Sequence, residues 1–114
     1  MDSIKDIQEA LEKFRDQRNW NQFHNPKDLA LALSVEAAEL NELFLWKKDE
    51  EFIDIPEERI KEELADIFAY AFLLAGKYRF DVKKIILEKI KKNASKYPVD
   101  KSFDRSDKYT DLDS

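Results

Sequence analysis

Two pairs of acidic residues stand at helical spacing in stretches that are otherwise rich in apolar residues. The first pair is Glu36 and Glu39 in SVEAAEL, and the second is Glu63 and Asp66 in EELADIF. Residues three apart on a helix have Cβ atoms about 5 to 6 Å apart, so each pair can direct its oxygens at one point. Carboxylate oxygens favour the hard cations Mg²⁺, Mn²⁺ or Ca²⁺, and Mg²⁺ commonly joins carboxylates to substrate phosphates. The pattern therefore predicts metal-dependent phosphate chemistry.

Glu36 is the strongest single candidate because of the face on which it lies. At about 100° per residue, Glu36 falls in the middle of a leucine face and Glu39 at its edge. Glu63 and Asp66 border the apolar face of the next expected helix. Desolvated carboxylates are costly without a counter-charge, and no Lys or Arg lies on these inward faces. A divalent cation supplies that charge, whereas either pair alone could equally be a solvated helix face. The leucine face consists of Leu29, Leu33, Leu40 and Leu43.

The composition predicts one all-α domain. The chain has 114 residues, of which 39% are charged and 43% hydrophobic, with one Gly and three Pro. Helix formers therefore dominate and helix breakers are rare. A net charge of −5 without a basic stripe argues against a nucleic-acid polymer as partner. Cysteine is absent, which excludes disulfides and thiolate chemistry.

A cytoplasmic location is expected, with no membrane partner. The start MDSIKDIQEA lacks the apolar core of a signal peptide. No apolar run approaches the ~20 residues that a membrane span needs.

Four helices are expected to position the acids. Helix-capping residues precede three of them, and prolines mark the start of the second and third and the end of the fourth. The expected helices run over about 4–18, 26–47, 56–77 and 82–97, with Ser3, Asn25 and Asp81 as N-caps. Residues 1–98 would form the catalytic domain and residues 99–114 a polar tail.

The second expected helix, LALALSVEAAELNELFLW, has apolar residues on nearly every side. Four helices of one small chain cannot easily cover such a helix. We therefore expect part of it to pack against another subunit of a homo-oligomer.

The signature E-x-x-E followed by E-x-x-D resembles that of the MazG-like nucleotide pyrophosphohydrolases. The surrounding segments RNWNQFHNP, LALSVEAAELNELFLWK, EELADIFAYAFLLA, KNASKYP and KYTDL are similar to the dCTP pyrophosphatase branch of that superfamily, over nearly the whole chain. Val35 stands where many MazG proteins have a further glutamate, so a ligand role of that position is absent.

The resemblance implies a four-helix bundle of the MazG-like type that forms a homodimer or homotetramer. It implies hydrolysis of a nucleoside triphosphate between its α and β phosphates, giving the monophosphate and pyrophosphate. dCTP or modified cytosine nucleotides are the favoured substrates, in a housekeeping role. All four acids would hold Mg²⁺, with Mn²⁺ as a substitute, and Glu36 or Glu39 would activate the attacking water.

The same resemblance implies residues that bind the substrate. Four aromatic or imidazole side chains match the positions that hold the base: Trp20, His24, Trp46 and Tyr70. Stacking suits a flat base, but Trp46 and Tyr70 could equally be core or interface residues. His24 could instead cap a helix end. Phosphate-binding positions are matched by Lys89, Asn93 and Lys96, and the tail contributes Tyr109. A solvated face is the alternative for the two lysines.

Two other functions remain open at this stage. A di-iron or di-manganese carboxylate bundle also uses inward acids, but it typically needs Glu-x-x-His motifs, and the one histidine lies outside both acidic motifs. A non-catalytic helical oligomer that binds a protein partner is compatible with the composition.

Overall fold

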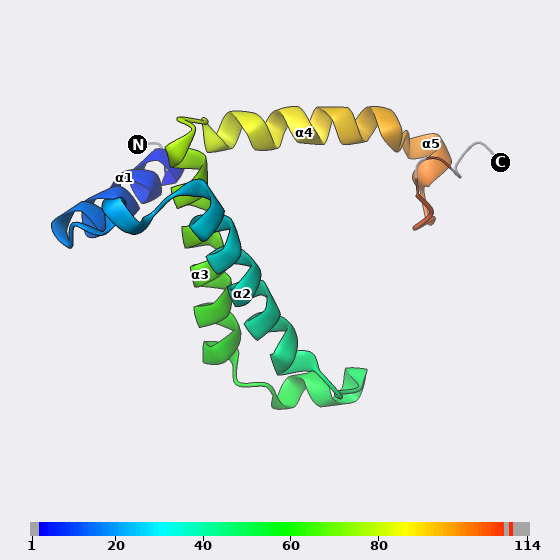
Figure 1. Cartoon of the computed structure of the whole chain (residues 1–114). Helices are drawn as coiled ribbons and strands as arrows, with labels where there is room; N and C mark the ends of the chain where they lie inside the picture. The colour runs from blue at the N-terminus through cyan, green and yellow to red at the C-terminus, as the bar shows by residue number, and fades with distance from the viewer. Residues whose placement is uncertain (1–2, 109, 111–114) are drawn as a thin grey trace. The chain divides into compact units, whose positions relative to one another are not determined.

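The computed structural model describes residues 3–108 and residue 110, and this part of the chain is helical with no strand (Figure 1). The all-α class is therefore confirmed.

The chain divides into two compact units, residues 1–80 and 81–114. The domain boundary expected at residue 98 stays a prediction. The helices are α1 Ser3–Gln17, η1 Trp20–Phe23, α2 Pro26–Phe44, η2 Asp49–Asp54, α3 Glu57–Lys77, α4 Val82–Lys96 and α5 Val99–Ser102, where η denotes a 3₁₀ helix.

Two of the three predicted N-caps, Asn25 and Asp81, are confirmed, whereas Ser3 lies within α1 as its first described residue. The Asn25 side chain accepts a hydrogen bond of 2.8 Å from the backbone N–H of Asp28, and Pro26 is the first residue of α2. Asp81 accepts a 3.0 Å hydrogen bond from the backbone N–H of Lys84 at the start of α4. Each cap satisfies a backbone donor that the first helical turn leaves free, so the register of both helices is fixed locally.

The C-terminal end of α2 differs from the expectation. The helix ends at Phe44 rather than about Lys47. Leu45 adopts an extended ψ of 132°, and Trp46 has a φ of 66°. These backbone angles cannot continue a right-handed helix, so the chain turns there and enters η2.

The helices α2 and α3 lie side by side and form an antiparallel hairpin (Figure 1). Its buried residues include Leu29 on α2, which is 2% exposed, and Leu73 on α3. Ile55, in the connection that leads into α3, is also buried. The hairpin thus carries most of the core of the first unit and brings Glu36, Glu39 and Glu63 together between its helices.

The helix α1 attaches to α3 through a polar contact at a glycine. Gln8 Nε2 donates a 2.9 Å hydrogen bond to the carbonyl oxygen of Phe72. A Cβ atom at Gly76 would lie 2.7 Å from the same Gln8 nitrogen. Gly76 therefore leaves the space in which Gln8 reaches the α3 backbone, while α3 continues to Lys77.

Several apolar side chains remain exposed. On α2, Leu31 is 60% and Val35 47% exposed, on the side opposite the Leu29 face. On α3, Phe68 is 58% exposed. On α4, the exposed apolar residues are Ile85, Ile86, Leu87 and Ile90. None of the helices in the described part of the chain is long and apolar enough to cross a membrane.

Candidate functional site

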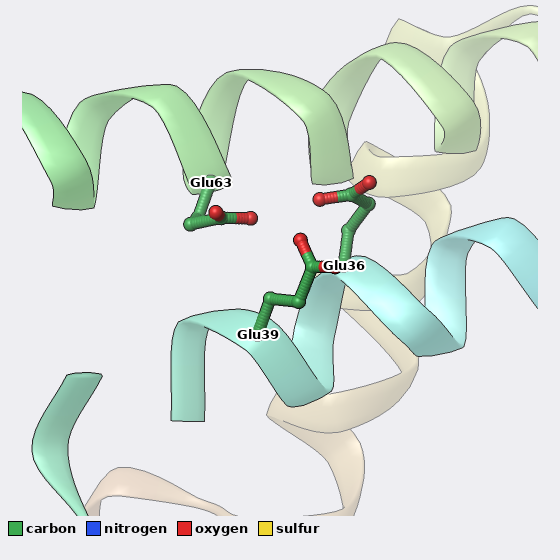
Figure 2. Close-up of side chains that lie close together, drawn as sticks. All are labelled: Glu36, Glu39 and Glu63. Carbon is green, nitrogen blue, oxygen red and sulfur yellow. The ribbon is translucent and has the colours of Figure 1, made fainter. Parts of the chain in front are cut away.

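Three carboxylates converge between α2 and α3. Glu36 and Glu39 lie one turn apart on α2, and Glu63 faces them from α3 (Figure 2). One oxygen from each can be chosen so that the three atoms lie within 4.8 Å of one another. The i,i+3 spacing on α2 and the antiparallel packing of the hairpin produce this arrangement.

Two of the carboxylate oxygens are buried without a partner. Oε2 of Glu36 and Oε2 of Glu63 are inaccessible to solvent and receive no hydrogen bond from the described residues. No described lysine or arginine forms an ion pair with either group. Ionised carboxylates can only accept hydrogen bonds, so these two oxygens lack any donor. They need a proton or a cation, because an unpaired buried charge is costly.

The acidic groups around Glu36 raise the pKa of its carboxyl. The adjacent carboxylate of Glu63, to which a protonated Glu36 would donate a hydrogen bond, raises the pKa of Glu36 to about 7. Burial raises this pKa further, as do a hydrogen bond that protonated Glu36 would donate to Glu39 and the negative charges of Glu39 and Asp66. Like charges and desolvation both disfavour the ionised form.

The donor set fits a hard divalent cation. Metal–oxygen distances of about 2.0–2.6 Å are compatible with one Mg²⁺, Mn²⁺ or Ca²⁺ ion that Glu36, Glu39 and Glu63 would hold. Such an ion would also supply the counter-charge that the two buried oxygens lack. Asp66 is exposed and is not one of the three converging residues, although its charge reaches Glu36. The structure thus brings together three of the four predicted ligands and leaves Asp66 beside them.

A second group of predicted residues lies before α2. Trp20 begins η1 and makes a T-shaped contact with Phe14 of α1, with ring centroids 5.8 Å apart. His24 follows η1 directly and is half-buried, with its Nδ1 buried and unpartnered among the described residues. Burial, followed by the positive charges of Lys77 and Arg15, lowers the pKa of His24. His24 precedes Asn25, the N-cap of α2, and is itself the C-cap residue of η1, where its backbone N–H donates a 3.1 Å hydrogen bond to the carbonyl oxygen of Asn21.

The other two predicted base-binding residues lie on or beside the hairpin. Trp46 follows α2 and is 91% exposed, so the structure does not place it in the core of this chain. Tyr70 is half-buried on α3, one turn after Asp66. The base-binding roles of both residues stay predictions.

The predicted phosphate-binding residues belong to the second unit. Lys89 and Asn93 line a surface hollow on α4. Lys96 is the last residue of that helix. Tyr109 lies outside the described residues. Their roles stay predictions.

Comparison with known proteins identifies the family. Residues 31–112 match the model of the MazG-like family. The chain belongs to the MazG-like family. It is 43% identical to dCTP pyrophosphatase 1 of Bos taurus and 39% identical to that of Homo sapiens, over 96% of this chain and 68% of each relative. A pyrophosphatase from Archaeoglobus fulgidus DSM 4304 superposes with a TM-score of 0.80 at 31% identity, over 86% of this chain and 94% of the other.

The extent of the family match separates the two groups of site residues. All four acids of this MazG-like chain lie within the matched segment, whereas Trp20 and His24 precede it. The curated relatives nevertheless align over 96% of the chain. The acids therefore lie inside the segment that the family model matches, whereas Trp20 and His24 lie outside it but within the wider similarity to the dCTP pyrophosphatases.

Sequence reasoning missed two residues beside His24. Lys77 Nζ donates a 2.5 Å hydrogen bond to Asn21 Oδ1, which joins α3 to η1. In the sequence, a lysine in the last turn of a helix suggests only a favourable interaction with the helix dipole. The two residues are 56 positions apart, and no local pattern connects them.

Proposed function

We propose that this MazG-like chain catalyses Mg²⁺-dependent hydrolysis of nucleoside triphosphates, dCTP or modified cytosine nucleotides among them, to the monophosphate and pyrophosphate. The observation that carries the proposal is the convergence of Glu36, Glu39 and Glu63 with two buried oxygens that lack a donor. The family match and the pyrophosphatase names of its relatives support the enzyme class, a nucleoside triphosphate pyrophosphohydrolase. Removal of aberrant nucleotides is the role consistent with this reaction.

The carboxylates have two tasks in this reaction. Glu36, Glu39, Glu63 and Asp66 would hold the cation, which when bound neutralises the triphosphate and polarises the α-phosphorus for in-line attack. Glu36 or Glu39 would orient the attacking water and accept its proton. The neighbouring carboxylates raise the pKa of Glu36 to about 7 without a cation. A bound cation would lower this pKa again and would instead make the attacking water more acidic.

The base and the phosphates would be held by the other predicted residues. Trp20, Trp46 and Tyr70 offer aromatic faces for stacking, and His24 offers a ring nitrogen without a partner. Lys89, Asn93 and Lys96 would bind phosphate oxygens, and the tail residue Tyr109 would order over the substrate.

The length of α2 supports the proposal of a base pocket shared by two copies. Trp20 and His24 precede α2, whereas Trp46 follows it. A helix of 19 residues is about 28 Å long, so one chain cannot place Trp20 and Trp46 against the same base. We therefore propose a homodimer, or a homotetramer built from dimers, in which Trp46 comes from a second copy. The exposed Leu31 and Val35 offer an apolar surface for such an assembly.

Neither alternative function has a specific observation in its favour. The converging residues of the described cluster are glutamates, without the histidine that di-iron bundles typically use. A non-catalytic interaction module gives no reason for unpaired carboxylates at a helix interface. A cytoplasmic location stays a prediction.

The proposal is tested by incubating the protein with each common ribo- and deoxyribonucleoside triphosphate, and with 5-methyl-dCTP, in the presence of Mg²⁺. Phosphorus NMR of the products distinguishes the two possible cleavages. Monophosphate plus pyrophosphate is expected, with a preference for cytosine deoxynucleotides. Diphosphate plus inorganic phosphate would contradict cleavage at the α-phosphorus, and inactivity on every nucleotide would contradict the enzyme itself.

A further inference from the structure

The turn η1 is fixed on two sides by side chains of α1 and α3. From α3, the ammonium group of Lys77 donates to the Asn21 side chain at 2.5 Å. From α1, the ring of Phe14 contacts the ring of Trp20 edge to face. Charge-assisted hydrogen bonds are stronger than neutral ones, so the Lys77 contact is a substantial restraint on a turn of four residues.

The helices α1 and α3, which both contact η1, are also joined to each other, and the segment between α1 and η1 makes further contacts. Gln8 of α1 bonds to the backbone of α3. The guanidinium of Arg18 lies 3.7 Å above the Phe14 ring and donates to the Phe14 carbonyl oxygen. The Gln22 side chain donates a 3.0 Å hydrogen bond to the carbonyl oxygen of Asn19, which closes the turn. The η1 turn is therefore supported from both helices, and Lys77 supplies the contact that comes from α3.

The surroundings of His24 contain the same lysine. The charged groups that act on the imidazole are Lys77 of α3 and Arg15 of α1, and Arg15 is itself paired with Asp16 at 2.8 Å. Together with burial, the two cations favour a neutral ring. A neutral imidazole has one donor and one acceptor nitrogen, which can match the donor and acceptor groups on a base edge.

We propose that Lys77 is a positioning residue for base recognition, which holds η1 through Asn21 and thereby sets the places of Trp20 and His24. The inference rests on the proposed function, because it assumes that these two side chains bind the base. We assign Lys77 no contact with the base or the phosphates, and its ammonium group donates a hydrogen bond to Asn21.

The structural part of the proposal is tested without substrate. His24 is the one histidine of the chain, so its ring protons titrate without overlap in proton NMR. In Lys77→Met, the pKa of His24 is expected to rise toward its usual value, and amide hydrogen exchange in residues 20–24 to become about tenfold faster. Asn21→Ala should also accelerate exchange there. Lys61→Met, which removes an exposed lysine from the same helix, should change neither quantity.

The functional part is tested by steady-state kinetics with dCTP. Lys77→Met and Asn21→Ala are expected to raise KM about tenfold with kcat within about twofold of wild type. Lys77→Arg should restore most of the loss, because arginine can also donate to Asn21. Circular dichroism and melting temperatures establish that each variant is folded.

Three results would decide against these proposals. Unchanged hydrogen exchange and an unchanged His24 titration in Lys77→Met would overturn the positioning role even if the wild type is active. A loss confined to kcat, with KM unchanged, would place Lys77 in the chemical step and also overturn it. A wild-type protein that turns over no nucleotide would overturn the proposed function together with the role in base recognition, whereas the NMR and exchange results would still report whether Lys77 fixes η1.

Discussion

Glu36 combines the polarity of a ligand with the position of a core residue. It stands on the face of α2 that carries the buried Leu29, and its pKa is raised to about 7 mainly by Glu63 and burial. The same side chain is thus unfavourable in the metal-free protein and suited to binding a cation. This conflict between local stability and function is typical of an active-site group.

The first prediction concerns the pH dependence of stability in EDTA. The Glu36 carboxyl has a pKa of about 7 in the folded protein against an ordinary value of 4.5, so it binds its proton more tightly when the chain is folded. Its stabilising contribution is therefore complete below 4.5 and is lost as the pH rises to about 7. Wild type should lose stability relative to Glu36→Gln across this window, as measured by urea unfolding. A wild-type-minus-variant difference that does not depend on pH would contradict the prediction.

The second prediction distinguishes the acids by their geometry. Mn²⁺ binding, followed by electron paramagnetic resonance, should weaken at least about tenfold in Glu36→Gln and in Glu63→Gln, because each loses a converging ligand. Asp66→Asn should have a smaller effect, since Asp66 is exposed and lies beside the converging group. Equal effects of all three substitutions would show that Asp66 is a ligand of the same rank.

The acids could be predicted from the sequence, whereas Lys77 could not. Glu36 conflicts with the helical pattern around it, and that local conflict is visible in the sequence. The contact of Lys77 with Asn21 depends on how α3 packs against η1, which no local spacing encodes. Likewise, only the structure shows that Asp66 remains exposed while Glu63 turns inward.

At the scale of the elements, helix starts were more predictable than helix ends. Asn25 and Asp81 cap their helices through local hydrogen bonds, so sequence alone fixes these boundaries. The end of α2 at Phe44 depends instead on the backbone of Leu45 and on Trp46 with its positive φ. Neither residue is a glycine, the usual signal for such an end.

The third prediction concerns the end of α3. Arg79 has a φ of 58°. The backbone N–H of Arg79 donates to the carbonyl oxygen of Gly76, and the backbone N–H of Phe80 donates to the carbonyl oxygen of Ala75. This is a Schellman end with arginine at the position that favours glycine. Arg79→Gly should be more stable than Arg79→Ala by about 1 kcal/mol, because only glycine adopts this backbone region without strain. Urea unfolding of the two variants measures the difference, and equal stabilities would contradict it.

At the scale of the whole molecule, the apolar surface and the separated aromatics both point to an assembly. The sequence predicts that α2 needs cover on several sides, and Leu31 and Val35 are exposed in the single chain. Trp20 precedes α2 and Trp46 follows it, which is a second reason to propose an assembly. This reason depends on the bounds of α2 in the structure, which the sequence alone does not give. A shared pocket would explain why an exposed tryptophan follows this helix.

The fourth prediction tests the shared pocket by complementation. Trp20→Ala and Trp46→Ala should each be weakly active alone. If each base pocket takes Trp20 from one copy and Trp46 from the other, exchange of subunits creates mixed dimers. In each mixed dimer, one pocket has both tryptophans and the other has neither. An equal mixture should then recover about a quarter of wild-type activity. A mixture no more active than its components would show that the pocket is not shared in this way.

The central claim is that the three converging carboxylates carry the hydrolysis, and its most direct test is the rate of Mg²⁺-dependent pyrophosphate release in two matched variants. Glu36→Gln should lower kcat by about a hundredfold or more, because it removes a cation ligand and a candidate base. Glu42→Gln, at an exposed glutamate of the same helix outside the cluster, should stay within about twofold of wild type. A folded Glu36→Gln protein that releases pyrophosphate as fast as Glu42→Gln would contradict the account.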